Sequence, residues 1–136
     1  MAESRGRASL FGVLGAAGGF LGVAAGAFLA HALRDVLPPE RLQVIDTAAR
    51  YQLLHALALV GVSIALATWQ SPGRALTLAG WLFVAGLVFF SGSLYALGLT
   101  GHRWWGALTP LGGACFLAGW IALGVGLYRK PPSRVT

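Results

Sequence analysis

The chain has 136 residues, which is the length of a single domain. Only 10% of its residues are charged and 57% are hydrophobic, whereas an ordinary soluble domain carries about 25% charged residues. The net charge of +6 does not indicate nucleic-acid binding, because the basic residues lie outside or at the ends of the apolar segments and form no basic stripe with interleaved aromatic residues. This composition excludes an ordinary water-soluble domain and predicts a protein whose main solvent is lipid.

The first predicted membrane span covers residues 8–30, which contain no charged residue. Arg5 and Arg7 precede it, and Ala30-His31-Ala32 has the small-x-small pattern of a signal-peptide cleavage site. However, the apolar run is longer than the usual 7–15 residues, roughly, of a signal sequence. We therefore expect a transmembrane helix that is retained in the protein.

This span is rich in glycine at four-residue spacing. Helices in lipid associate through close backbone approach, which small residues permit. Two such series run along the span, and together they comprise Gly15, Gly18, Gly19, Gly22 and Gly26. We expect this glycine face to pack against a neighbouring helix of the same chain; the alternative is a seam between copies in an oligomer.

The connection after the first span predicts a short helix at the membrane surface. Pro38 and Pro39 end the first helix, and Pro39 can occupy the first turn of a new one. Over residues 39–50 the apolar and polar side chains fall on different faces, and Asp46 and Arg50 can pair at i, i+4. We expect an amphipathic interfacial helix that runs into the second span. The alternative is a docking face for a partner.

Three further spans are predicted at residues 52–69, 75–100 and 106–128, because roughly 17–25 apolar residues cross a bilayer. The connections between them are short, so neighbouring helices should be antiparallel. The predicted fold is an all-α membrane protein: residues 1–136 form a single transmembrane domain, a four-transmembrane-helix antiparallel bundle with the short interfacial helix between the first two spans.

The distribution of Lys and Arg predicts the orientation. Six of the ten lie at the two termini and in the loop after the second span, and four lie on the other side. Because cytoplasmic segments carry the excess of basic residues, both termini should be cytoplasmic.

Polar side chains of the spans gather in the non-cytoplasmic half of the predicted bundle. Tyr51 with His55, and Ser91 with Tyr95, are i, i+4 pairs, so each pair shares a helix face. The candidate cluster, binding or structural, is His31, Tyr51, Gln52, His55, Ser91, Ser93, Tyr95 and Thr109. We predict that His31 and His55 lie close enough to share one hydrogen-bonded network with the nearby hydroxyls.

Three interpretations of this cluster are open. The groups can bond one another and lock the bundle; the histidines can relay protons or help to handle a solute; or two histidines can ligate a haem iron. No catalytic set is visible, because no carboxylate lies inside a span and no Ser/His/Asp set, phosphate loop or HExxH occurs. The single Cys115 excludes an internal disulfide and a cysteine-based metal site within one chain, and no metal site is expected.

Five strings in this sequence resemble one family: GAFLAHAL at residues 26–33, ARYQLLHALAL at 49–59, FSGSLY at 90–95, TPLGG at 109–113 and Gly119-Trp120. They occur in the order found in the YgdD/YwdK-like small integral membrane proteins (domain of unknown function four-two-three). Leu29 and Ala32 stand where the first signature of that family has glycines. The resemblance spans about residues 10–125 and implies four helices and a bacterial inner-membrane address, without an established activity.

We therefore expect a non-enzymatic inner-membrane protein without a cofactor, serving as an accessory, assembly or interaction subunit of a larger membrane complex. Its expected partners are the lipid bilayer and either another membrane protein or a second copy, and not nucleic acid. The first alternative is a small transporter or proton-handling protein that uses the His/Tyr/Ser cluster. The second is a haem- or quinone-binding membrane subunit.

Overall fold

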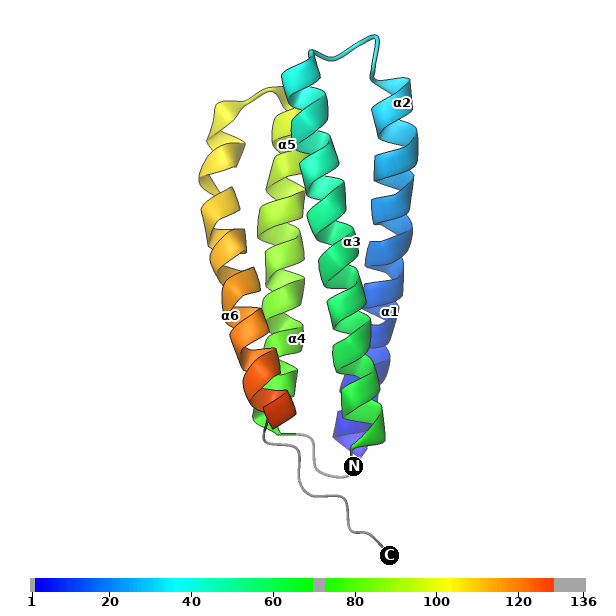
Figure 1. Cartoon of the computed structure of the whole chain (residues 1–136), viewed down its shortest axis with the longest axis vertical. Helices are drawn as coiled ribbons and strands as arrows, with labels where there is room; N and C mark the ends of the chain where they lie inside the picture. Colours follow the sequence, from blue (N-terminus) through cyan, green and yellow to red (C-terminus); the bar gives the residue numbers. More distant parts are fainter. Residues whose placement is uncertain (1, 70–72, 129–136) are drawn as a thin grey trace, which may run out of the picture.

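The computed structural model describes residues 2–69 and 73–128, and in these ranges the regular structure is helical (Figure 1). Four helical segments are long and apolar enough to cross a membrane. They comprise the following elements in chain order: α1 (Ala2–Ala24), η1 (Ala25–Leu29) and α2 (Ala30–Ala32); α3 (Pro39–Thr68); α4 (Arg74–Gly86), η2 (Leu87–Gly92) and α5 (Ser93–Thr100); η3 (Arg103–Ala107) and α6 (Thr109–Tyr128).

Two of the four rods contain a π-helical segment. The first rod runs from α1 through η1 into α2, and the third runs from α4 through η2 into α5 without a break (Figure 1). The spans measured by length and hydropathy are Arg5–Leu29, Pro39–Thr68, Arg74–Thr100 and Arg103–Tyr128. The four antiparallel spans agree with the predicted fold class.

Residues 39–50 are helical, but they do not form a separate helix across the membrane surface. They are the first turns of α3, which continues from Pro39 to Thr68 (Figure 1). The reason is that their apolar face is buried against protein: Ile45 lies against Gly98 of α5, and Ala48 and Ala49 are buried as well. An apolar stripe that finds helical partners has no need to lie flat in the interface.

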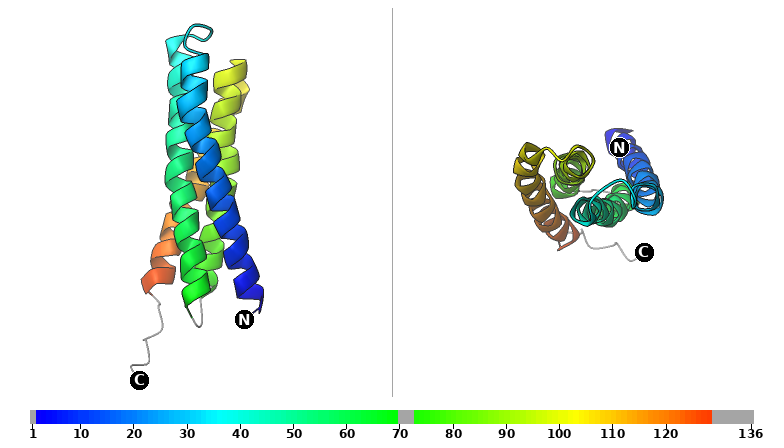
Figure 2. Two further views of the ribbon diagram at one scale, coloured as in Figure 1. Left: turned by 90° about the vertical axis from the view of Figure 1, so that its right-hand side faces the viewer. Right: turned by 90° about the horizontal axis from the view of Figure 1, so that it is seen from above.

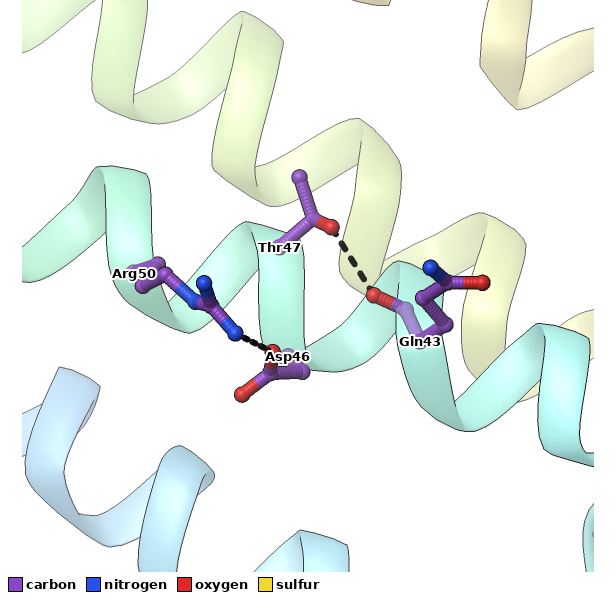
Figure 3. A network of polar contacts seen from close by, with 4 residues as sticks. All are labelled: Gln43, Asp46, Thr47 and Arg50. Atoms are coloured by element: carbon purple, nitrogen blue, oxygen red, sulfur yellow. Dashed lines mark hydrogen bonds and ion pairs between the residues drawn. The ribbon is translucent and has the colours of Figure 1, made fainter.

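Two polar features accompany this upper part of α3. The predicted pair forms, with Arg50 Nη2 2.5 Å from Asp46 Oδ2, and Thr47 Oγ1 donates to the carbonyl of Gln43 (Figure 3). The Arg50 side chain is largely exposed, so this pair contributes little to stability. In contrast, Arg41 donates hydrogen bonds from Nε to the Gly98 carbonyl, at 2.7 Å, and from Nη2 to the Leu99 carbonyl. These bonds satisfy carbonyl groups at the end of α5.

The rods are arranged around α3. The first rod packs mainly on α3, α6 packs on α4 and η2, and α3 also contacts α4, η2 and α5. Seen from above, α1 and α6 lie on opposite sides of the molecule (Figure 2). The contact between α1 and α4 is small, so the first rod is held by α3 along most of its length.

Most of the predicted glycine face of α1 is the seam with α3. A Cβ added at Gly15 would lie 2.8 Å from Val60 and 2.9 Å from the Ala56 carbonyl, and one at Gly22 would lie 2.9 Å from Leu53. Gly18 and Gly26 face α3 with more room, over alanine side chains. Gly19 differs from the prediction: a Cβ there would meet nothing within 4 Å, because that position points past α3.

A second glycine seam joins α6 to the third rod, and the sequence analysis did not predict it. A Cβ at Gly112 would lie 2.2 Å from the backbone nitrogen of Phe90. Farther along α6, Gly119 lies against the ring of Phe83, and from the other side Gly86 of α4 lies against the ring of Phe116. The two helices therefore approach so closely that at Gly112 a backbone occupies the space of a side chain.

Candidate functional site

His55 lies inside the bundle and has a partner at each ring nitrogen. Its side chain is 2% exposed. Nδ1 lies 2.7 Å from the carbonyl oxygen of Tyr51, one turn earlier in α3, and must donate there because a carbonyl only accepts. Nε2 then accepts from the indole Nε1–H of Trp120 in α6 at 3.1 Å. These bonds assign a neutral imidazole with the proton on Nδ1, and they connect α3 to α6.

Aromatic rings surround this histidine. The imidazole stacks on the ring of Phe116 with centroids 3.5 Å apart and an interplanar angle of 10°. The Tyr51 ring contacts that of Phe90 at 4.6 Å, and the Phe83 ring meets Trp120 edge-on at 5.3 Å. Phe116 and Trp120 were not among the predicted site residues. Their positions in an apolar span do not mark them as partners of His55, and only the packing of α6 on α4 and η2 brings them to it.

The other predicted polar residues divide into separate contacts. Ser93 Oγ and Thr109 Oγ1 lie 2.8 Å apart and join α5 to α6, and Ser93 Oγ also donates to Phe90 O at 3.0 Å. Gln52 Nε2 donates to the carbonyl of Gly18 at 2.8 Å and joins α3 to the first rod. Each bond satisfies a polar group that would otherwise be costly in hydrocarbon. The bonds of Thr109 and Gln52 also join two helices, whereas the bond to Phe90 O lies within the third rod.

The hydroxyls of the third rod do not serve as the partners of His55 that we predicted. His55 bonds instead to the Tyr51 carbonyl and to Trp120. His31 is exposed at the end of the first rod, and its side chain forms no hydrogen bond within the part of the chain that the structure describes. The histidines therefore do not share one network through these hydroxyls.

Ser91 and Tyr95 are the two exceptions to this pattern of satisfied groups. In the described ranges, Ser91 Oγ and Tyr95 Oη are buried and have no hydrogen-bond partner. Both residues border a groove of about 710 Å³ between the first rod and the third, which the sequence analysis did not predict. Gln52 of α3 also contributes to its lining.

The groove is apolar and opens sideways. One wall is formed by α1 and η1, from Leu14 to Leu29, and the other by α4, η2 and α5, from Val84 to Leu99. The groove exists because the first rod makes few contacts with α4, so the first and third rods remain apart beside α3. Both π-helical segments face it, since Ala25 and Phe28 of η1 and Val88 and Ser91 of η2 line it. Single π turns inside α-helices occur often at functional sites.

Comparisons with known proteins identify the family of this chain. Residues 25–113 match the family described as "Protein of unknown function (DUF423)". The chain is 46% identical over 114 residues to the UPF0382 membrane protein YwdK of Bacillus subtilis, covering 84% of this chain and 92% of that protein. It is 41% identical over 120 residues to the membrane protein SSP2132 of Staphylococcus saprophyticus, covering 88% and 98%.

A third relative is named as an inner membrane protein. The chain is 39% identical over 124 residues to the UPF0382 inner membrane protein YgdD of Escherichia coli, covering 86% of this chain and 88% of that protein. No solved structure matches this chain. The profile match, the extent of the identities and the four membrane-spanning helices together show that the chain is an integral membrane protein of the DUF423 (UPF0382) family.

Proposed function

We propose that this protein is a non-enzymatic accessory protein of the bacterial inner membrane that acts by binding. It takes up an apolar component of the membrane in the groove between the first and third rods, and in this way serves a larger membrane assembly. The observation that carries the proposal is the contrast between the groove and the rest of the interior. The groove is open, apolar and unfilled by this chain's side chains, whereas Gln52, His55, Ser93 and Thr109 of the predicted cluster form hydrogen bonds that hold helices together.

The surroundings of His55 favour this proposal over a proton-handling role. A proton relay needs an imidazole that can exchange its proton with water or with a second titratable group. In this structure Nδ1 donates to a backbone carbonyl and Nε2 accepts from an indole N–H, and neither partner is a proton acceptor or donor near neutral pH. Phe116 covers a face of the ring.

The same geometry opposes haem ligation by the two histidines. An axial ligand needs a free ring nitrogen that points at the iron. Nε2 of His55 points at Trp120, and His31 lies exposed at the end of the bundle without a hydrogen bond to the cluster in the described residues. A binding function through the groove requires no change in either histidine.

The experiment is photo-crosslinking in intact membranes. A photoreactive amino acid at Val88, which lines the groove and is 61% exposed, is compared with one at Leu117, which is 70% exposed on α6 and does not line the groove. We expect a discrete adduct from position 88 and only diffuse background from position 117. The adduct should disappear when Gly92→Phe fills the groove. Equal background labelling from both positions would contradict the proposal.

A matched variant controls for the glycine substitution itself. Gly92 borders the groove, and a Cβ there has only the Leu87 carbonyl nearby, at 3.8 Å. Gly61 of α3 is exposed, has nothing within 4 Å of such a Cβ, and does not line the groove. Gly61→Phe should therefore leave the adduct from position 88 unchanged.

A further inference from the structure

The length of the groove matches one leaflet of a bilayer. Its walls run from Leu14 to Leu29 in the first rod and from Val84 to Leu99 in the third. Each stretch rises by about 22 Å at 1.5 Å per residue. Half of a bilayer, including its headgroup region, is about 20–22 Å thick. The groove therefore extends from the end of the bundle that carries α2 and α5 to about the middle of the membrane.

The groove, about 22 Å long and about 710 Å³ in volume, has room for extended hydrocarbon chains. An extended hydrocarbon chain about 4 Å across, the contact distance between carbon atoms, fills roughly 300 Å³ over that length. Two such chains side by side fit the space.

The unpartnered hydroxyl of Tyr95 supplies a hydrogen-bond donor at a suitable depth. The span Arg74–Thr100 is about 40 Å long and the hydrocarbon core about 30 Å thick, so about 5 Å of helix lies outside the core at each end. Tyr95 lies five residues before Thr100, about 7.5 Å from the end and close to the edge of the core. The ester carbonyls of a glycerolipid lie at this edge, and they can only accept hydrogen bonds.

Ser91 lies one turn deeper in η2 and also lacks a partner in the described residues. Both oxygens are buried in this structure. Ser91 lies about 6 Å deeper than Tyr95 at 1.5 Å per residue, so an ester carbonyl at the edge of the core is matched in depth by Tyr95. Pairing the Tyr95 hydroxyl would remove the cost of an unsatisfied group in hydrocarbon.

Arg34, the candidate partner for an anionic headgroup, lies at this end of the bundle beside the acidic Asp35. His31 and Arg34 follow the groove-lining residues Phe28 and Leu29 within a few positions, and both are exposed. Neither side chain forms an ion pair in the described part of the chain. A phosphate above the groove would therefore find basic groups that are free to bind it.

From the length, the volume, the Tyr95 donor and the basic Arg34, we infer that the groove holds one glycerophospholipid of the leaflet on the α2/α5 side. Its two acyl chains lie along the groove, an ester carbonyl accepts from Tyr95, and its phosphate lies near Arg34. This inference rests on the proposed function, since it names the chemistry of the component that the groove takes up.

Native mass spectrometry of the full-length protein, extracted in mild detergent, tests the inference. We expect the wild-type protein to retain one phospholipid per chain and Gly92→Phe to lose it, with Gly61→Phe retaining it. Where Gly92→Phe does not fold, Leu21→Trp fills the groove from the α1 wall, and Leu54→Trp is the control on the outer face of α3; these leucines are 58% and 53% exposed. Tyr95→Phe should weaken retention about fivefold, the effect of one hydrogen bond.

The outcomes separate the inference from the proposed function. A wild-type protein without bound phospholipid, or one whose groove-filled variants retain it, overturns the inference. If the crosslinker at Val88 labels a segment of another protein or a second copy of this chain, the phospholipid is excluded while uptake in the groove stands. If position 88 labels nothing beyond the background at Leu117, both are excluded.

Discussion

The backbone contact between α6 and η2 predicts a sharp difference between two adjacent glycines. A Cβ at Gly112 would lie 2.2 Å from Phe90 N and 2.6 Å from the carbonyl carbon of Phe89, whereas one at Gly113 would lie 3.8 Å from the Phe90 ring. To reach ordinary contact at 3.4 Å, the backbones at Gly112 must separate by about 1.2 Å. A backbone cannot turn aside as a side chain does, so α6 must move away from η2.

We therefore expect Gly112→Ala to be the more damaging substitution. Alanine favours a helix over glycine by about 1 kcal/mol at either position, so this gain cancels in the comparison. The difference that remains is the cost of overpacking, about 1–3 kcal/mol, and the rigid neighbour places it toward the upper end. Separation of the helices would also lengthen the nearby bond between Ser93 and Thr109.

The assay is thermal unfolding of both variants in the same detergent, followed by circular dichroism. Gly113→Ala should unfold at or above the wild-type temperature, and Gly112→Ala well below it. Equal stability of the two variants would refute the reasoning, because it would show that α6 and η2 are not in backbone contact.

Three further predictions concern the first seam, the buried histidine and the orientation. Gly22→Leu should lower the free energy of unfolding by about 1–3 kcal/mol, because Leu53 already occupies the space. Gly19→Leu meets open space and should leave the melting temperature within the experimental error. Similar losses for both variants would contradict the assigned seam. His55→Ala should lower the free energy of unfolding by about 2–4 kcal/mol, because it leaves a cavity and an indole N–H without an acceptor. His55→Gln should restore part of this stability in a melting experiment, since an amide oxygen can accept the bond from Trp120. No recovery would mean that ring stacking on Phe116 dominates. Reporter fusions at Thr136 and beside Pro38 should report opposite sides, with the C-terminus cytoplasmic, and a periplasmic signal from Thr136 would reverse the predicted orientation.

The polar cluster shows how much of the site can be predicted from sequence patterns. Sequence reasoning selected Gln52, His55, Ser93 and Thr109, and the structure uses each of them in a contact between helices. It did not predict the partners, because a backbone carbonyl or an indole can satisfy an imidazole as well as a hydroxyl can. Which group satisfies which depends on helix rotation, and the spacing of polar residues in a sequence does not specify the rotation of one helix against another.

The amphipathic segment before the second span illustrates the same limit. Its helical character and its start at Pro39 follow from local chemistry, and both appear in α3. Whether its apolar stripe faces lipid or protein depends on what lies beside it. In this structure α5 and η1 lie there, so the segment stands upright in the bundle.

Sequence alone determined that this protein has four membrane spans. Insertion into a bilayer is favourable for each run of about 20 apolar residues by itself, independently of the other runs. A helix also satisfies the hydrogen-bonding groups of its own backbone. Only the tertiary structure decided which glycines touch, which residues complete the surroundings of His55, and that a groove with two unpartnered hydroxyls lies between the first and third rods. These features depend on the tilt and rotation of rods far apart in the chain. Lipid is as apolar as most of the side chains, so the hydropathy that identifies a span contains no information about the face it turns to a neighbour.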